Sequence, residues 1–341
     1  RQMCIRDRLT PTLFGATIIG LSLSQPPLAN AQTTLVYNNF TPPTHAITLM
    51  AKRWSAEASK ASNGKVKFRF PAKTLAPPPR QWSMVTKGVA DLGMLANIFE
   101  TKRLTLTELA TLPFGTSTAE KTSIALWKTH KKFFEGANEY KGVKLLGLFV
   151  HGGGDLLMMK KAITQASDLK GLKIRVSRGM AAKTMKAMGA VLVPTPGVKT
   201  FEVVSKGIVD GAILPSSDVP KFKMIPYIKH IYHIPGKFYN TAFSIMMNQK
   251  KWDSLSKDVQ QAIESKAGLN IARHAKAWDD NAKEARPQFK AGGINYAPAS
   301  AKLVAEMKKR YSSFDADWIK IAEKKGVDGK AALAFYRKHA M

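Results

Sequence analysis

The segment HGGGD, at residues 151–155, follows an apolar run at residues 144–150 and could present backbone N–H groups to an anion. In lipases and esterases, an HGGG motif after a strand stabilises the oxyanion formed from the attacked carbonyl. Those enzymes also need a G-x-S-x-G turn that exposes the nucleophilic serine. No G-x-S-x-G occurs in the 341 residues. An exported esterase is therefore kept only as the enzymatic alternative, and we expect a protein that catalyses no reaction.

Histidine and cysteine, which often bind metals, are spaced here in a way that predicts no compact metal site. The histidines form no H-E-x-x-H pair, and we expect His230 and His233 on opposite faces of a strand. Cys4 is the only cysteine, and the phosphate-binding motifs G-x-x-x-x-G-K-[ST] and G-x-G-x-x-G do not occur. We expect no metal and no cofactor, although a metal that bridges ligand and protein stays open.

The formal net charge of +29 is high for a chain of this length. Such a charge can attract polyanions or an anionic membrane surface. The lysines are scattered singly and in pairs, however, and no motif of a nucleic-acid-binding fold accompanies them. We interpret the charge as a solvated basic surface and expect no nucleic acid partner. A basic surface-binding module is the second alternative function.

Residues 1–31 have the pattern of an export signal. Arg6 and Arg8 precede the apolar segment 13–24, and the stretch ends in the small-x-small sequence ANA. This pattern predicts cleavage near Ala31, so that the mature chain begins near Gln32. The absence of methionine at position 1 leaves open whether residues 1–8 are native.

After the signal, strand-like and helix-like segments alternate twice along the chain. Period-two or continuous apolar runs predict strands, and apolar residues three and four apart predict helices. A long helix is expected to start near Ser256 and to run past thirty residues, because its apolar positions continue to Trp278. Two amphipathic helices are expected after residue 301. The alternation predicts α/β architecture with two lobes.

Three ordered motifs are specific to one family. The core motif is DLKGLKIRV, KAMGAVLVPTP and FEVVSKGIVDG, all within residues 168–211. It is preceded by a strand, proline-rich loop, helix and strand at residues 64–95, and followed by a strand, tryptophan turn and helix at residues 243–263. This sequence resembles the TRAP transporter solute-binding proteins, the extracytoplasmic receptors of the DctP type. The similarity covers essentially all of residues 33–341.

The resemblance implies a two-lobed periplasmic binding protein, type II-like, with a ligand cleft between the lobes and a long helix that spans both. Lobe I would comprise residues 32–151 and about 241–280, and lobe II residues 152–240 and about 281–341. The implied function is to capture a small organic acid in the periplasm and to deliver it to the membrane subunits of a TRAP permease. Dimerisation through the C-terminal helices stays open.

The family's carboxylate-binding arginine corresponds to Arg175, in the segment KIRV. An arginine at the end of a strand also suits this role physically, because α/β clefts bind ligands there and guanidinium matches a carboxylate. Three departures leave the ligand's identity open. Asp155 stands where relatives that bind sialic acid have a second arginine, Gly197 and Lys199 replace an aromatic residue and a glutamate, and Leu214 precedes Pro215 in place of a polar residue.

Further ligand-binding candidates come from the ends of strands and from their flanking turns. They are polar or aromatic side chains expected to face the same cleft as Arg175. We therefore predict roles in binding for Asn39, Phe40, Asn97, His151, Asp155, Ser216, Ser217, Phe238 and Tyr239.

Overall fold

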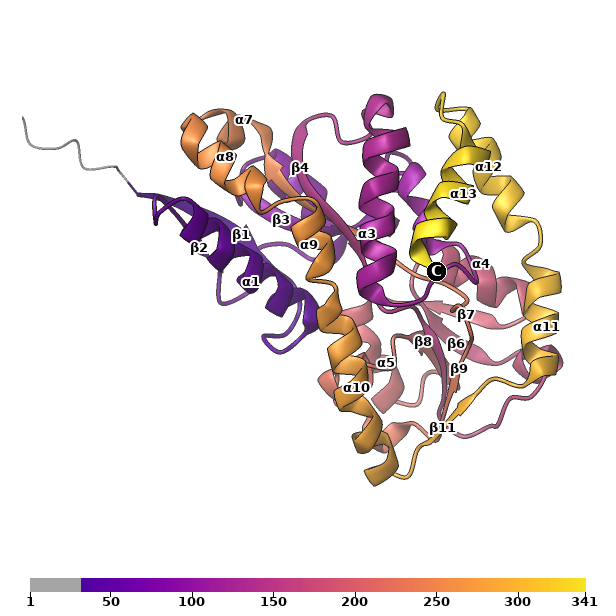
Figure 1. The fold of residues 1–341 in the computed structure, drawn as a ribbon. Coiled ribbons are helices and arrows are strands. Elements are labelled where there is room, and N and C mark those ends of the chain that lie inside the picture. Colours follow the sequence, from indigo (N-terminus) through magenta and orange to yellow (C-terminus); the bar gives the residue numbers. More distant parts are fainter. Residues whose placement is uncertain (1–31) are drawn as a thin grey trace, which may run out of the picture. The chain divides into compact units, whose positions relative to one another are not determined.

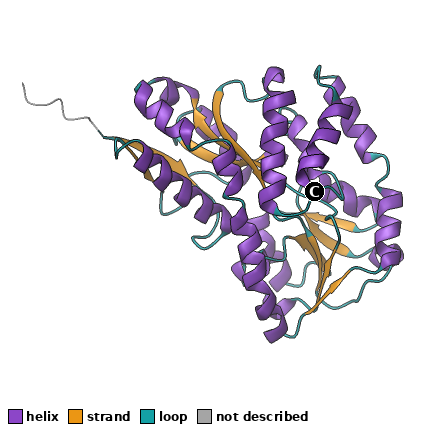
Figure 2. Ribbon diagram, viewed as in Figure 1, coloured by secondary structure: helices purple, strands orange, loops and turns teal. Residues whose placement is uncertain are grey.

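The computed structural model describes residues 32–341, which form two mixed sheets with helices around them (Figures 1 and 2). The predicted export signal lies outside the described residues. No helix among the described residues is both long and apolar enough to cross a bilayer. The predicted two-lobed α/β architecture is confirmed in this arrangement, with one sheet in each lobe.

The first sheet has the strand order β2-β1-β3-β10-β4. Its β3 is buried along its whole length, as expected for a central strand made of LGMLA. Strand β10 runs antiparallel to both of its neighbours. The strands are β1 (Thr33–Asn38), β2 (Val66–Arg69), β3 (Leu92–Ala96), β4 (Val143–Val150) and β10 (Ala242–Asn248). The helices beside this sheet are α1 (Ala46–Ala61), α2 (Gln81–Thr86), α3 (Ala119–Thr129) and α7 (Gln249–Asp253).

The second sheet has the strand order β11-β9-β5-β8-β6-β7. Its parallel strands β8, β6 and β7 are connected through helices, as the alternating pattern predicts. The strands are β5 (Asp155–Met158), β6 (Lys173–Val176), β7 (Val191–Pro194), β8 (Gly211–Leu214), β9 (His230–His233) and β11 (Asn295–Pro298). The helices between them are α4 (Met180–Ala187), α5 (Thr200–Ser205) and α6 (Asp218–Lys221).

Three segments join the sheets: two short crossings, and the long helical stretch between β10 and β11. The chain leaves β4 for β5 through the glycine-rich motif and returns from β9 to β10 through residues 234–241. These two crossings pack closely: a Cβ atom on Gly154 would lie 1.7 Å from Cε1 of Tyr239, and one on Gly153 would lie 2.3 Å from Cγ of Lys237. Gly153 also has a φ of +76°, which favours glycine. Gly153 and Gly154 of HGGGD are therefore required by the crossing.

The predicted long helix is wrong in one respect, because the structure divides it into α8 (Lys257–Ser265), α9 (Leu269–Arg273) and α10 (Lys276–Ala291). Gly268, with a φ of +61°, interrupts it and donates its N–H to the carbonyl of Leu146 at 2.7 Å. A Cβ atom at Gly268 would lie 2.8 Å from the Trp127 ring. The apolar periodicity passes through this break, so the pattern alone could not reveal it. Helix α10 still contacts elements of both lobes.

The C-terminal region contains three helices where we predicted two: α11 (Ala301–Arg310), α12 (Phe314–Glu323) and α13 (Gly329–Ala340). Helix α13 packs on α3, beside the first sheet, and Figure 1 shows the two side by side. The last helix is thus not confined to the second lobe, where the expected boundaries put it. The remaining lobe boundaries stay a prediction.

Candidate functional site

A cavity of about 190 Å³ lies between the two sheets. The first lobe contributes the loop after β1, the start of α1 and the end of β3, and the second contributes the ends of β6, β7 and β8. Both crossings and α10 complete the wall. Most of the wall is apolar, and its aromatic side chains are Phe40, Phe99, Phe222, Tyr239, Phe243 and Trp278. The cavity is where ligands bind in α/β folds, outside the carboxyl ends of strands.

Arg175 extends from β6 into the wall of this cavity and is 1% exposed. Its Nε donates to the carbonyl of Thr195 at 3.1 Å, Nη2 donates to the same oxygen, and Nη1 donates to the carbonyl of Ile213 at 2.9 Å. Guanidinium has five N–H donors, so one on each Nη is left for a ligand. Burial lowers the pKa of Arg175 to about 10, which leaves it charged at neutral pH.

His151 lines the cavity as a neutral ring. Burial is the main cause that lowers its pKa to about 3, and the positive charge of Lys237 acts in the same direction. Its Nδ1 accepts a hydrogen bond from the N–H of Gly153 at 2.9 Å, so the single ring proton is on Nε2. The ring is held between Tyr239 and Trp278. His151 therefore offers one N–H donor from a fixed position.

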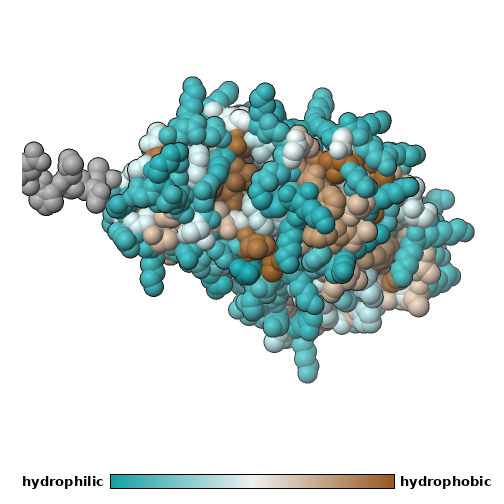
Figure 3. Space-filling model, turned by 45° about the horizontal axis from the view of Figure 1, so that its top comes forward, coloured by the Kyte–Doolittle hydropathy of each residue, from teal (hydrophilic) through white to brown (hydrophobic). Residues whose placement is uncertain are grey.

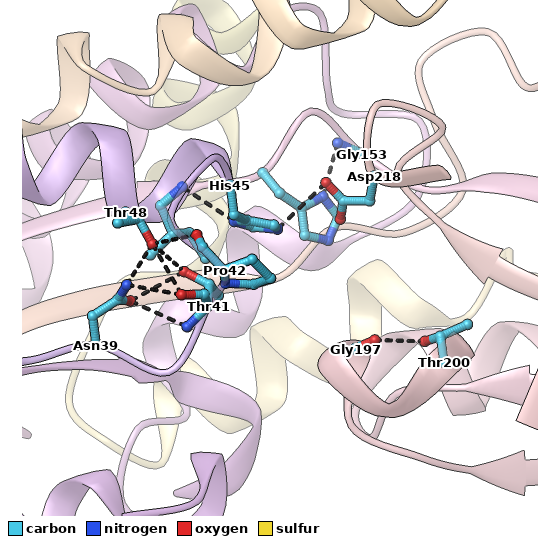
Figure 4. A network of polar contacts seen from close by, with 11 residues as sticks. Asn39, Thr41, Pro42, His45, Thr48, Gly153, Gly197, Thr200 and Asp218 are labelled. Carbon is cyan, nitrogen blue, oxygen red and sulfur yellow. Dashed lines mark hydrogen bonds and ion pairs between the residues drawn. The ribbon is translucent and has the colours of Figure 1, made fainter. Parts of the chain in front are cut away.

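His45 and Asp218 meet across the cavity wall, one from each lobe. His45 is the N-cap residue of α1, and its Nδ1 accepts from the N–H of Ile47 at 3.2 Å. Its Nε2 lies 3.4 Å from Oδ1 of Asp218, at the start of α6. Figure 4 shows the imidazole of His45 directed at this carboxylate. The cavity thus contains one buried cation, one buried carboxylate and two oriented imidazoles.

The comparisons with known proteins agree with this architecture. Residues 37–323 match the family model for bacterial extracellular solute-binding proteins, family 7, called DctP. The chain belongs to the DctP family. Its members are solute-binding receptors that capture small organic acids for TRAP permeases, and the resemblance in the sequence is confirmed.

Individual relatives of this DctP-family chain are of similar length. The chain is 34% identical to the outer membrane transporter protein TsaT of Comamonas testosteroni, over 90% of this chain and 91% of that protein. Among solved structures, it resembles a TRAP periplasmic solute-binding protein from Bordetella bronchiseptica with bound (R)- and (S)-mandelate, at a TM-score of 0.87 and 34% identity. That match covers 90% of this chain and 98% of the other.

A second solved structure is a TRAP solute-binding protein from Rhodoferax ferrireducens in complex with copurified benzoate. Its TM-score is 0.83 and its identity 26%, with 91% of this chain and 98% of that chain covered. Both relatives match over nearly their full length, so the DctP fold is present as a whole in residues 32–341.

The structure brings together four of the residues that the sequence singled out for binding. Arg175, Phe40, His151 and Tyr239 all line the cavity, from β6, the loop after β1 and the two crossings. Phe40 and Tyr239 belong to its aromatic wall. Their part in ligand binding in this DctP-family protein stays a prediction.

Six other predicted residues do not line the cavity. Asn39 bonds to Thr48 and Thr41, as Figure 4 shows. Asn97 bonds to Thr107, Tyr140 and Ser244, in the core behind the cavity. Ser216 and Ser217 lie in the turn between two residues that do line it, and Phe238 is buried against Tyr239. Strand ends placed these residues near the cavity, but the direction of each side chain could not be read from the sequence.

Asp155 is the sixth predicted residue that does not line the cavity. It stabilises the return crossing from β9 to β10. Its Oδ1 accepts from Nζ of Lys237 at 2.5 Å and lies 3.4 Å from Nδ1 of His233, and its Oδ2 accepts from the N–H of Ser216 at 3.3 Å. Burial alone would raise the pKa of Asp155, but these three partners together hold it well below its ordinary value. Asp155 therefore fixes β5 to the return crossing as an ionised carboxylate.

Sequence reasoning missed His45, Asp218 and Trp278 as cavity residues. Trp278 was expected only on an apolar helix face, and α6, which begins at Asp218, was not predicted. The sequence predicts a helix that begins at His45, but nothing in the sequence pairs this residue with one so far along the chain. Among residues 32–341, no group of His, Cys, Asp and Glu side chains has the arrangement of a metal site.

Proposed function

We propose that this DctP-family receptor captures an aromatic monocarboxylate, with the carboxylate bound to Arg175 and the ring held by the aromatic wall of the cavity. The observation that carries the proposal is a buried guanidinium with two unused N–H donors in an otherwise mainly apolar cavity. A carboxylate can accept from both Nη atoms at once, which gives a charge-assisted pair. His151 Nε2 supplies a third donor to the same cavity.

The size and wall of the cavity favour an aromatic ligand over a sugar acid or a dicarboxylate. Its volume of about 190 Å³ is close to that of a cavity of about 150 Å³ that holds benzene. A second carboxylate or several hydroxyl groups would meet phenyl and indole rings, and their desolvation would oppose binding. The mandelate and benzoate bound by the two relatives have the same combination of one ring and one carboxylate.

Neither part of such a ligand is sufficient alone. A charge-assisted hydrogen bond contributes about 1.5–3 kcal/mol. Burial of a phenyl ring, at roughly 150 Å² and about 25 cal/mol per Å², contributes about 4 kcal/mol. Micromolar affinity corresponds to about 8 kcal/mol. The ring and the carboxylate therefore have to act together, with water excluded by closure of the two lobes.

The receptor would work in the periplasm, after removal of a signal at residues 1–31, and would hand the acid unchanged to the permease. The cavity is built from one chain, so the proposal does not require the homodimer that the C-terminal helices left open.

Titration calorimetry of the mature chain tests this function. We expect benzoate, phenylacetate or mandelate to bind, and succinate, pyruvate and glucuronate to bind much more weakly. Arg175→Ala should weaken binding of the aromatic acid by roughly 10- to 100-fold, because it removes the charge-assisted pair. Arg175→Lys keeps the charge but not the planar fork. Its affinity for the aromatic acid should lie between that of the wild type and that of Arg175→Ala.

Arg273→Ala is the matched control, since Arg273 is exposed on α9 and lies outside the cavity wall. Thermal melting without ligand checks that each variant is folded. Equal affinity of Arg175→Ala and the wild type for the aromatic acid would contradict the proposal.

A further inference from the structure

Asp218 has a carboxylate that the binding scheme above does not use. The residue is 3% exposed and lines the cavity, yet its Oδ1 accepts no hydrogen bond from any group in residues 32–341. Burying a carboxylate oxygen without a hydrogen-bond donor is unfavourable. Such a group is expected where a ligand completes its hydrogen bonding.

His45 does not fulfil this need. Its Nδ1 already accepts from the backbone of α1, so Nε2 carries an N–H and faces Asp218. The distance of 3.4 Å allows attraction but makes no hydrogen bond to Oδ1. Phe222 stacks on the ring at 5.5 Å and Trp278 meets it edge-on at 5.0 Å, so the imidazole cannot move closer without disturbing both. His45 therefore positions Asp218 and leaves acceptor capacity for a ligand.

We propose that Asp218 accepts a hydrogen bond from a hydroxyl group of the ligand, so that the preferred ligand is a hydroxylated aromatic acid. This inference rests on the proposed function, because it takes the ligand's carboxylate to be on Arg175. The two charges also orient the ligand: Asp218 repels a carboxylate and Arg175 attracts one. The ligand's hydroxyl group then donates to a buried acceptor, Asp218, and its carboxylate pairs with a buried cation, Arg175.

The surroundings of Asp218 favour a hydroxyl over an ammonium group. An ammonium group has three N–H donors, whereas a hydroxyl has one. The cavity wall includes Phe222 and Trp278, which pack on His45, and also Leu214, and these side chains offer an ammonium group little further acceptor capacity. Desolvated N–H groups without acceptors would weaken binding of an amino acid.

The test compares ligands that differ by one group. The wild type and Asp218→Asn are titrated with mandelate and phenylacetate, with 3-hydroxybenzoate and benzoate, and with phenylglycine. In at least one of the two pairs, the hydroxylated acid should bind the wild type at least tenfold more tightly. Asp218→Asn, which keeps the shape but removes the charged acceptor, should reduce this ratio by about tenfold and leave the affinity for the unhydroxylated acid within a few-fold. Asp218→Ala is a second variant, for the case that the amide introduced by Asp218→Asn disturbs the cavity.

Asp253→Asn, on the exposed surface of α7, is the matched control and should keep the wild-type ratio. Equal binding of both members of each pair, unaffected by Asp218→Asn and Asp218→Ala, overturns the role of Asp218 and leaves the proposed function standing. Tighter binding of phenylglycine than of mandelate overturns the choice of a hydroxyl in favour of an ammonium group. If no aromatic acid binds the wild type, both the proposed function and this inference fail.

Discussion

At the scale of single residues, Gly197 sets the space beside the guanidinium. A Cβ atom at this position would lie 3.9 Å from Nη2 of Arg175 and 4.0 Å from Cδ1 of Leu214. Both contacts are ordinary van der Waals distances, so a methyl group fits and a larger side chain would extend along the cavity wall. An aromatic side chain here would occupy space that this chain leaves to its ligand.

Gly197→Phe should therefore weaken binding of an aromatic acid by about 100-fold, because the new ring competes for the same volume. Gly197→Ala should change the affinity less than about tenfold. Calorimetry measures both, and the melting temperature without ligand should stay near that of the wild type for each. Wild-type affinity in Gly197→Phe would show that the ligand's ring lies elsewhere.

The sequence could predict Arg175 in the cavity because its motif is local: one strand carries the arginine to the cleft. The contact between His45 and Asp218 could not be predicted in the same way. It joins the start of α1 in one lobe to the start of α6 in the other, and only the packed fold brings these ends together. Polar residues such as Asn97 were misplaced for the opposite reason, since a strand end gives the location but not the direction of a side chain.

At the scale of elements, the crossing from β4 to β5 depends on the absence of side chains. The predicted strands were largely found, because alternation and apolar runs survive in tertiary packing, whereas the break at Gly268 was missed. The glycines of HGGGD raised the question of anion binding, which the missing G-x-S-x-G answered against. In the structure, the close approach of Lys237 and Tyr239 explains Gly153 and Gly154.

Gly154→Ala should lower the free energy of unfolding by about 1–3 kcal/mol, since the methyl group would overlap the ring of Tyr239. The shift of that ring should also weaken ligand binding. Gly152→Ala is the control, because the nearest atom to its Cβ, in Trp278, is 3.9 Å away. Denaturant unfolding and calorimetry on both variants test this, and similar losses in the two would refute the explanation.

At the scale of the whole molecule, the basic charge is spread over the surface. Figure 3 shows hydrophilic side chains projecting over most of one face, with apolar residues exposed between them. The two buried charges of the cavity, Arg175 and Asp218, are by contrast shielded from solvent. Surface charge is screened by salt within about 10 Å at 0.1 M, so ligand affinity should depend on the cavity more than on the net charge.

Stability of the whole fold should fall in acid, starting from the buried imidazole of His151. Its folded pKa of about 3 lies below its unfolded value of about 6.5, so between these pH values only the unfolded chain takes up the proton. Each pH unit of acidification in that range should cost about 1.4 kcal/mol for this group. Asp155, whose folded pKa is depressed, adds a loss that begins only below about pH 4.

Urea unfolding at pH 7, 6, 5 and 4 measures the effect. In His151→Gln, the side chain can still accept from the N–H of Gly153. The free energy of unfolding of this variant should depend less on pH, by the uptake of about one proton. Buried His130, with a pKa lowered to about 4, should keep part of the slope in that variant. An identical slope in the wild type and His151→Gln would mean that His151 is not buried in its neutral form.

The position of β10 between β3 and β4 also has a consequence for the order of synthesis. The first sheet is incomplete until the chain has been extended through Asn248, although β4 ends at Val150. At a synthesis rate of about 5–20 residues per second, the facing edges of β3 and β4 stay unpaired for on the order of ten seconds. Open strand edges invite pairing with other chains. The open edges of β3 and β4 in a nascent chain therefore have to be shielded until β10 is made. A chain truncated before Ala242 would aggregate.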